Sequence, residues 1–341
     1  MNAELISTFV PEFRDIFIRR YEILEFLNRE GIVGRRTLSN KLNIPERIIR
    51  EEIAKLTEMD CVSVDSSGIT IKKEGRINLK RFYEVYRDLN NLTELGNRIA
   101  SLLGIAETIV VKGDSSSDDY AFINLGSATA RLINLSICDG DYMGITGGKT
   151  LRAIADRLSE NKRDLDLTII PARGSLGKVA DYQSNSIAAT MATKLHCNYK
   201  VLPVPDAVSK EALNMLLENE EVSETYNMLK NLDLFIFGIG RADEMLQRKG
   251  IDEATKKEIL DKGAVSEVIG HYFDIKGKEI YEAKSIGISL KDFLKIPRVF
   301  AVAGGAEKAE AIISISNLRS DMVLVIDESA AKEIIKLGGK R

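Results

Sequence analysis

The first 75 residues combine helical and alternating patterns of apolar positions. Apolar residues recur at helical spacing in three segments, which lie at about 16–27, 36–42 and 45–56. Gly31 ends the first segment, and Pro45 suits the first position of the third, where its missing N–H costs nothing. Apolar and polar residues then alternate at 61–65 and 69–72 around Ser66-Ser67-Gly68, which is the pattern of a β-hairpin. Three helices and a hairpin in this order predict a winged helix-turn-helix at 1–75.

Near-continuous apolar runs alternate with helical stretches from residue 107 onward. The runs lie at 109–111, 143–145, 167–170, 200–204, 234–237, 299–302 and 322–326. Strands that are apolar throughout and separated by helices form a parallel sheet covered on both faces. We therefore predict an α/β protein whose residues 105–341 form a Rossmann-like, doubly wound domain. The mostly polar segment at 76–104 is predicted to be a helical linker between the two domains.

The composition is that of an ordinary soluble protein. Of the 341 residues, 44% are hydrophobic and 29% are charged, with a formal net charge of −3. This charge excludes a protein that is basic throughout, but it leaves room for a local nucleic-acid face. No apolar run reaches membrane-spanning length and no signal peptide is recognisable, so we expect a cytoplasmic protein without membrane contact. The widely spaced Cys61, Cys138 and Cys197 are predicted to be buried thiols rather than disulfides or metal ligands.

The third predicted helix carries basic residues outside its apolar side. In a helix-turn-helix the corresponding helix enters the major groove, where basic side chains contact phosphates and base edges. We predict Arg47 and Arg50 on the groove face. The residues predicted to contact the DNA backbone are Arg35, Arg36, Lys41 and Lys55. The alternative is a solvated charged helix in a protein-interaction domain, which Glu46, Glu51 and Glu52 favour because they dilute the positive field. The hairpin that follows favours double-stranded operator DNA as the partner.

A glycine-rich turn lies between the predicted strand at 143–145 and the next helix. Its sequence, Gly144-Ile145-Thr146-Gly147-Gly148-Lys149-Thr150, lets the backbone approach a ligand closely and points N–H groups at it. Such groups favour an anion, usually a phosphate. The spacing matches neither a Walker loop nor the dinucleotide fingerprint. The alternative is a tight strand-to-helix turn without a ligand.

Together with the predicted winged helix-turn-helix, which is the expected DNA-binding head of the chain, several motifs resemble the SorC family of bacterial transcriptional regulators over nearly the whole chain. Beside the glycine-rich turn, they are Arg19–Leu24, Pro171–Gly177, Gly238–Ala242, Gly263–Glu267 and Ala303–Ala309. The resemblance implies a repressor of a glycolytic operon that fructose-1,6-bisphosphate releases from DNA. It also implies an effector domain similar to sugar-phosphate isomerases of the NagB type, assembly into a homodimer or homotetramer, and no cofactor.

The resemblance also implies an effector site. The residues that match the family's ligand positions are Gly148, Lys149, Thr150, Arg173, Gln183, Arg248, Glu267 and Lys308. The three consecutive residues match a phosphate loop, the other cations match phosphate contacts, and Gln183 and Glu267 match contacts to sugar hydroxyls. Lys149 is a departure, because a threonine is expected there. Each residue has a plain structural alternative: an ion pair between Arg173 and Glu267, a solvated Lys308, or a helix cap at Gln183.

The alternative function is that of a sugar-phosphate isomerase or deaminase. Such an enzyme needs a general base near its substrate. The two histidines, His196 and His271, lie outside the predicted site loops, and His196 is expected to have a structural role at a helix end. Asp181, Asp243 and Glu267 remain as possible carboxylate bases. The DNA-binding head favours a regulator over an enzyme.

Overall fold

The computed structural model describes residues 9–159, 165–174, 179–202, 214–248, 251–283 and 287–338. Contacts divide the chain into two compact units, Met1–Glu94 and Leu95–Arg341. The division falls inside the segment predicted to be a linker. None of the helices in the described ranges is long and apolar enough to cross a membrane.

The N-terminal unit is a winged helix-turn-helix, as predicted. Its first elements are α2 (Pro11–Glu30), α3 (Arg35–Leu42), α4 (Glu46–Glu58), β1 (Val62–Asp65) and β2 (Gly68–Ile71). Strands β1 and β2 form an antiparallel hairpin, and a bridge from Val33 to Ile69 adds a third short segment. The first helix begins five residues before the predicted start, and Pro45 is the N-cap of α4 rather than its first residue.

The core of this unit joins the three helices to the hairpin. Ile23 and Leu27 of α2, Leu38 of α3 and Ile49 of α4 are fully buried, and Ile69 of β2 is 1% exposed. Helix α2 ends where Gly31 takes a φ of 79°, a left-handed conformation that glycine adopts without a steric penalty. The apolar stripe read from the sequence is therefore the packed face of each helix.

The predicted helical linker consists of three helices. They are α5 (Lys73–Arg81), α6 (Tyr83–Leu89) and α7 (Leu92–Leu103). The first two pack on α2, and the ring of Tyr86 stacks on that of Tyr21 with 4.2 Å between centroids. Helix α7 packs against the first strand of the second unit, where a Cβ on Gly96 would lie 2.3 Å from the Thr108 carbonyl oxygen. The segment is thus divided between the two units and is not one continuous helix.

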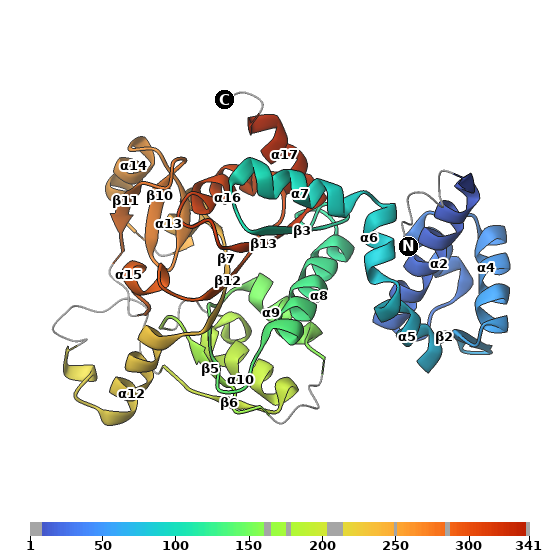
Figure 1. The fold of residues 1–341 in the computed structure, drawn as a ribbon, viewed down its shortest axis with the longest axis horizontal. Helices are drawn as coiled ribbons and strands as arrows, with labels where there is room; N and C mark the ends of the chain where they lie inside the picture. The colour runs from blue at the N-terminus through green and yellow to red at the C-terminus, as the bar shows by residue number, and fades with distance from the viewer. Residues whose placement is uncertain are drawn as a thin grey trace. The chain divides into compact units, whose positions relative to one another are not determined.

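The C-terminal unit is built on a seven-stranded parallel sheet (Figure 1). In the order of the sheet, its strands are β3 (Glu107–Val111), β13 (Val323–Asp327), β12 (Arg298–Val302), β7 (Leu234–Gly238), β4 (Tyr142–Ile145), β5 (Thr168–Pro171) and β6 (Asn198–Tyr199). The prediction of a doubly wound parallel sheet is confirmed. Only the strand predicted at 200–204 differs in position. The strand found there, β6, ends at Tyr199, just before the predicted run, and residues 203 and 204 lie outside the described ranges.

The chain direction reverses once across this sheet. From β4 it proceeds outward to β5 and β6, then returns to β7 and continues the other way to β12 and β13. Neighbouring strands β4 and β7 therefore form the topological switch point. In open α/β sheets, ligands bind at this point beyond the carboxyl ends of the strands.

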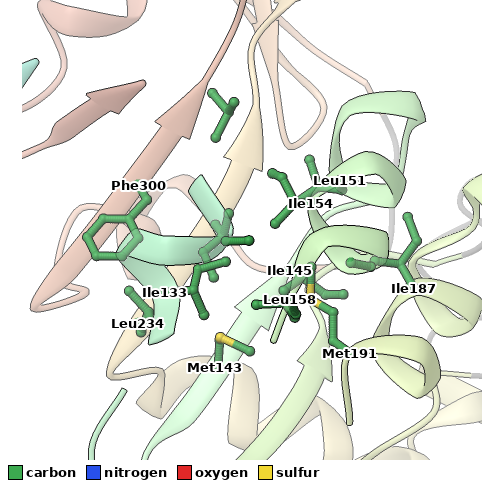
Figure 2. Close-up of a cluster of buried hydrophobic side chains, with 14 of the residues drawn as sticks. Ile133, Met143, Ile145, Leu151, Ile154, Leu158, Ile187, Met191, Leu234 and Phe300 are labelled. Atoms are coloured by element: carbon green, nitrogen blue, oxygen red, sulfur yellow. The ribbon is translucent and has the colours of Figure 1, made fainter. Parts of the chain in front are cut away.

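Helices cover both faces of the sheet. One face carries α8 (Asp119–Ser136), α9 (Lys149–Arg157) and α10 (Ser184–Leu195), whose apolar residues interlock with Met143, Ile145 and Leu234 (Figure 2). On the other face, α17 (Glu328–Gly338) packs on β13 and β3, α7 packs on β3 through Gly96, and α16 (Ala309–Ser316) packs on α17 (Figure 1). The shorter elements are η1 (Ala180–Tyr182), α12 (Glu220–Met228), η2 (Leu229–Asn231), α13 (Ala242–Arg248), α14 (Glu253–Asp261), α15 (Leu290–Phe293) and η3 (Ala306–Lys308).

A second, antiparallel sheet was not predicted. It has the order β11 (Glu279–Glu282), β10 (His271–Asp274), β9 (Ala264–Val268) and β8 (Gly240–Arg241). Tyr272 is fully buried and packs with Leu246 of α13 and Ile259 of α14. The strands are short and carry charged or polar residues such as Glu267, His271 and Glu279, so they lack the apolar runs that mark the parallel strands. Strand β9 carries Glu267, one of the residues predicted for the effector site.

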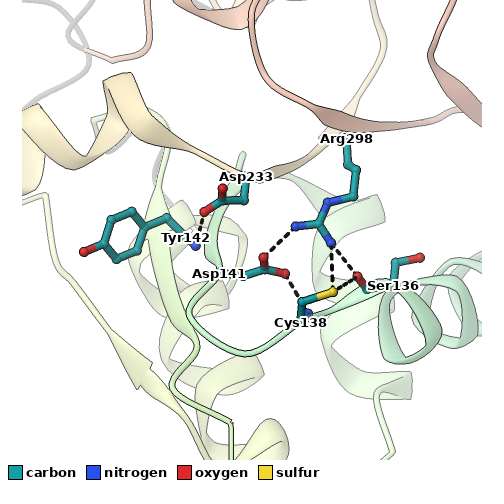
Figure 3. A network of polar contacts seen from close by, with 6 residues as sticks. All are labelled: Ser136, Cys138, Asp141, Tyr142, Asp233 and Arg298. Atoms are coloured by element: carbon teal, nitrogen blue, oxygen red, sulfur yellow. Dashed lines mark hydrogen bonds and ion pairs between the residues drawn. The ribbon is translucent and has the colours of Figure 1, made fainter.

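A polar network holds the amino-terminal edge of the parallel sheet (Figure 3). The Arg298 guanidinium donates to the buried Asp141 carboxylate at 2.6 Å and to the Ser136 carbonyl at 2.5 Å. Asp141 also accepts the N–H of Cys138 at 2.7 Å.

The Cys138 residue is exposed, which contradicts the prediction that all three cysteines are buried: it lies in the polar loop after α8 instead of in an apolar strand. Burial raises the pKa of the half-buried Cys197 thiol to about 11.

Candidate functional site

Four loops meet at the carboxyl edge of the parallel sheet, because parallel strands all end at the same side. The loops follow β4, β5, β7 and β12 and begin at Thr146, Ala172, Ile239 and Ala303. Two of them, after β4 and β7, flank the topological switch point. Most of the residues predicted for the effector site lie in these loops or in the helices that they lead into.

The glycine-rich turn has the backbone geometry of an anion loop. Gly148 lies at φ 113° and ψ 166°, a region that only glycine occupies readily, and a Cβ there would meet open space. A Cβ on Gly147 would lie 2.6 Å from the Tyr182 carbonyl oxygen, so the turn also needs a glycine for close packing. Helix α9 begins at Lys149, and its first N–H groups have no partner within the helix. This end of α9 can receive an anion.

Lys149 and Gln183 take specific places beside this turn. The Lys149 side chain is exposed, and its ammonium lies 4.6 Å from the ring centroid of Phe122 on α8, which holds it by a cation–π contact. Gln183 is the N-cap residue of α10, but its side chain does not cap the helix. The adjacent Tyr182 carbonyl accepts the Gly148 N–H at 2.8 Å. The loop before α10 therefore closes one side of the glycine turn.

Arg173 and Glu267 form a buried ion pair. Their side chains are 9% and 5% exposed, and the Arg173 guanidinium donates to a Glu267 oxygen at 2.9 Å. The same oxygen accepts the Gly270 N–H at 2.8 Å. The structure thus brings together two predicted site residues that are 94 positions apart. Leaving a buried carboxylate or guanidinium unpaired costs several kcal/mol. A ligand that separates Arg173 from Glu267 must therefore supply a hydrogen bond and an opposite charge or dipole to the group it engages.

Lys308 is a half-buried cation in η3. It forms no ion pair with any residue that the structure describes. Burial lowers the pKa of its ammonium below the ordinary value of 10.5, although Glu244 and Glu307 act to raise it. Arg248, 67% exposed, lies 3.7 Å from the Glu244 carboxylate. Lys308 and Arg248 therefore share the surroundings of one carboxylate.

A fully buried carboxylate fixes the loop that carries Lys308. One oxygen of Asp327 accepts the Gly305 N–H at 2.7 Å and the N–H and hydroxyl of Ser115 at 2.7 and 2.6 Å. Its other oxygen accepts from Ser329 and Ala330. Sequence reasoning missed Asp327, Glu244 and Tyr182, since none belongs to a recognisable ligand motif. The spacing of Glu244 and Arg248, one helical turn apart, was the only available signal.

The basic residues predicted for DNA contact are all on the surface of the N-terminal unit. Arg35, Arg36, Lys41, Arg47, Arg50 and Lys55 are exposed. On α4, Arg47 pairs with Glu51 at 3.2 Å, Arg50 with Glu46 at 4.0 Å and Lys55 with Glu58 at 2.9 Å. Such exposed pairs are weak and can open when a phosphate approaches.

Glu52 differs from the other acidic residues of α4. It was predicted to dilute the positive field of the helix surface, but it is 6% exposed and faces inward. Its two carboxylate oxygens bind Arg19 at 2.8 Å and Arg20 at 2.6 Å, both on α2. Glu52 is therefore a structural anchor for α4, and its charge is neutralised within the unit.

His196 and His271 occupy structural positions. His196 ends α10 in a left-handed conformation with a φ of 53°, as expected for a helix-end role. His271 Nδ1 lies 2.6 Å from Glu279 on the neighbouring strand of the antiparallel sheet. Among the acidic residues considered as bases, Asp243 is bound by Arg241 at 2.6 Å and Glu267 by Arg173.

Comparisons with known proteins cover both units. A family model described as a CggR N-terminal DNA-binding domain matches residues 16–86, and one described as a sugar-binding domain matches residues 87–336. The chain is 33% identical to the central glycolytic genes regulator of Bacillus subtilis, over 96% of each chain. It is 31% identical to the protein of that name from Priestia megaterium, over 98% of each chain.

Solved structures agree with these matches. A SorC family transcriptional regulator from Enterococcus faecalis superposes with a TM-score of 0.67 at 32% identity, covering 71% of this chain and 99% of that one. The full-length sorbitol operon regulator of Klebsiella pneumoniae has the same TM-score at 17% identity, covering 92% and 97%. At that identity the second likeness shows the fold alone.

Proposed function

Because the chain belongs to the SorC family of transcriptional regulators, we propose that it represses a glycolytic operon and releases the operator when fructose-1,6-bisphosphate binds its C-terminal unit. The relatives and structural neighbours are named as regulators, so the protein is a DNA-binding regulator with a sugar-binding domain and not a sugar-phosphate isomerase. The identity of the sugar and of the operon is the proposed part.

One observation carries the choice of a phosphorylated ligand: the half-buried Lys308 ammonium forms no ion pair with a described residue, and burial outweighs the pull of the nearby carboxylates Glu244 and Glu307. Lysine is rarely buried without a partner, because desolvation disfavours the charged form. The lowered pKa of Lys308 is the sign of that cost. A phosphate placed there gives the ammonium a direct ion-pair partner, and the nearby Arg248 adds a second cation.

A second anion position supports a bisphosphate over a monophosphate. The start of α9 can receive one phosphate through the backbone N–H groups of its first turn, such as that of Thr150, while the Gly148 N–H stays bonded to the Tyr182 carbonyl. Lys308, in η3, and Arg248, at the end of α13, receive the other phosphate: the lysine as a point charge and the arginine as a forked donor. The Arg173–Glu267 pair offers both donors and an acceptor, and we assign it, with Gln183, to the sugar hydroxyls and the adjoining phosphate.

Ligand control of DNA binding follows from linkage. A ligand changes the affinity for DNA only as far as it binds the free and DNA-bound forms unequally. We propose that the chain acts as a homodimer or homotetramer, which sets the spacing of the heads on operator half-sites. The sugar phosphate then rearranges the loops that carry Arg173 and Glu267 and alters the contacts between subunits.

A thermal-shift panel of glycolytic sugar phosphates tests the ligand. We expect fructose-1,6-bisphosphate to raise the melting temperature, with little response to fructose-6-phosphate or glucose-6-phosphate. Lys308→Ala should abolish this response and still bind the operator. Lys295→Ala is the matched control, since Lys295 is an exposed lysine just before the amino-terminal end of β12, at the opposite edge of the sheet. Equal shifts by all three sugars, or an unaltered response in Lys308→Ala, would contradict the proposal.

A further inference from the structure

The exposed face of α4 is centred on a different set of residues than the sequence alone indicated. Helix α4 buries Ile49, Glu52, Ile53 and Leu56. Successive helix residues are about 100° apart, so the direction opposite this buried set falls on positions 47, 51, 54 and 58. All four of these residues, Arg47, Glu51, Ala54 and Glu58, are exposed. Arg50 and Lys55 flank this face instead of lying at its centre.

The centre of this face pairs a cation with a carboxylate. Arg47 and Glu51 lie one helical turn apart, their charged groups are 3.2 Å from each other, and their side chains are 88% and 63% exposed. The pair therefore presents donors and an acceptor side by side to whatever the helix faces. In the major groove, an arginine donates to O6 and N7 of guanine, and a glutamate accepts from the N4 amino group of cytosine.

The charge balance of α4 argues against a purely phosphate-binding surface. Its three cations are each ion-paired with a carboxylate of the same helix: Glu51, Glu46 and Glu58. Affinity for phosphates grows with the number of cations that replace counterions, and these carboxylates offset that gain. An unbonded carboxylate is repelled by DNA. A hydrogen bond from a base to the carboxylate offsets this repulsion. Since only some bases present a donor there, the size of the offset depends on the base sequence.

Position along the helix separates Glu51 from Glu58. The amino-terminal turns of a recognition helix are the ones that reach base edges. Glu51 lies in the second turn of α4, whereas Glu58 is the last residue of the helix. We infer that Glu51 is a specificity-determining residue that selects a cytosine in the operator, beside the guanine that Arg47 selects. This inference rests on the proposed binding of operator DNA by the head.

The test compares full-length wild type, Glu51→Gln and Glu58→Gln. Each protein selects binding sites from a pool of random duplexes at the same salt concentration, and dissociation constants are then measured for the preferred duplex and for its single-base variants. The two substitutions remove one exposed, ion-paired carboxylate from the same helix, so they match in charge. Circular dichroism and thermal unfolding check that both variants keep the fold.

We expect wild type and Glu58→Gln to prefer cytosine at the same half-site position. Glu51→Gln should lose roughly tenfold of that preference, with a shift toward adenine because glutamine pairs with its N6 and N7. If Glu51→Gln binds all duplexes more tightly with its base preference unchanged, Glu51 only repels phosphates and the inference is wrong. Even with that result, the proposed function would stand if the wild-type protein selects a DNA site and releases it when sugar phosphate is added. Wild type that selects no duplex sequence would overturn both.

Discussion

Lys308 combines burial, a lowered pKa and the lack of a described ion-pair partner. The folded unit holds its ammonium at a cost, since burial lowers the pKa below 10.5. Such a group favours deprotonation in the folded state, so its own contribution to the free energy of unfolding improves as pH rises through the lowered pKa. A bound phosphate reverses the preference, because it stabilises the charged form.

The affinity for fructose-1,6-bisphosphate should therefore fall as pH rises through the lowered pKa of Lys308. We expect the decline to begin below the range in which an ordinary lysine titrates, while the phosphates stay dianionic. Calorimetric titrations between about pH 7 and pH 10 measure it. Lys308→Arg should bind with little pH dependence, since arginine stays charged throughout this range. A wild-type affinity that is as flat as that of Lys308→Arg would remove Lys308 from the site.

At the scale of elements, the turn from β4 into α9 depends on one unusual backbone conformation. Gly148→Ala meets open space, so it strains the backbone without a clash. We expect it to lower the free energy of unfolding by about 1–3 kcal/mol and to weaken fructose-1,6-bisphosphate binding as the turn relaxes. Urea unfolding and calorimetry measure the two effects.

Gly140→Ala is the matched control for this substitution. Gly140 also has a positive φ, 80°, with open space at its Cβ, but it precedes β4 and so lies at the other edge of the sheet. It should lower stability and leave ligand affinity unchanged. If Gly148→Ala binds the sugar phosphate as well as Gly140→Ala does, the glycine turn does not hold a phosphate.

The polar network at the amino-terminal edge of the parallel sheet is expected to stabilise the fold without contacting the ligand. Among the described residues, Arg298→Ala leaves the buried Asp141 carboxylate only the Cys138 N–H as a donor, and we expect a loss of about 3 kcal/mol in the free energy of unfolding. Adding Asp141→Asn should recover part of that loss, because no uncompensated charge remains. Urea titrations of the single and double variants measure both. A loss below 1 kcal/mol, or a changed sugar-phosphate affinity, would contradict this division between the two edges.

Sequence reasoning reached the elements whose patterns are strong. The parallel strands are apolar runs, and α4 has a clear apolar stripe, so both were predictable. The antiparallel sheet was not, since β8 has two residues and β10 and β11 carry His271, Glu279 and Glu282. The site residues were predictable only through family resemblance. Spacing cannot show that Arg173 meets Glu267, because their contact is made by the packing of two separate sheets.

At the scale of the whole molecule, the proposed regulation must be reciprocal. If fructose-1,6-bisphosphate weakens operator binding by some factor, the operator must weaken fructose-1,6-bisphosphate binding by the same factor. We expect a factor of about 10 to 100, within the usual range of allosteric coupling. Fluorescence anisotropy with labelled operator and calorimetry with the ligand give the two factors at one salt concentration. Clearly unequal factors would show that the two ligands do not bind one linked set of states.

Glu52 gives the head a property that engineers of gene switches can use. By clamping Arg19 and Arg20 of α2 from the inner side of α4, it fixes the rotation of that helix independently of the outer residues. Substitutions at the outer residues can then change the contacts with DNA without changing how the helix packs on the rest of the unit. New operators would be addressed by rewriting Arg47, Glu51 and Ala54 alone, while the metabolite response of the C-terminal unit is kept.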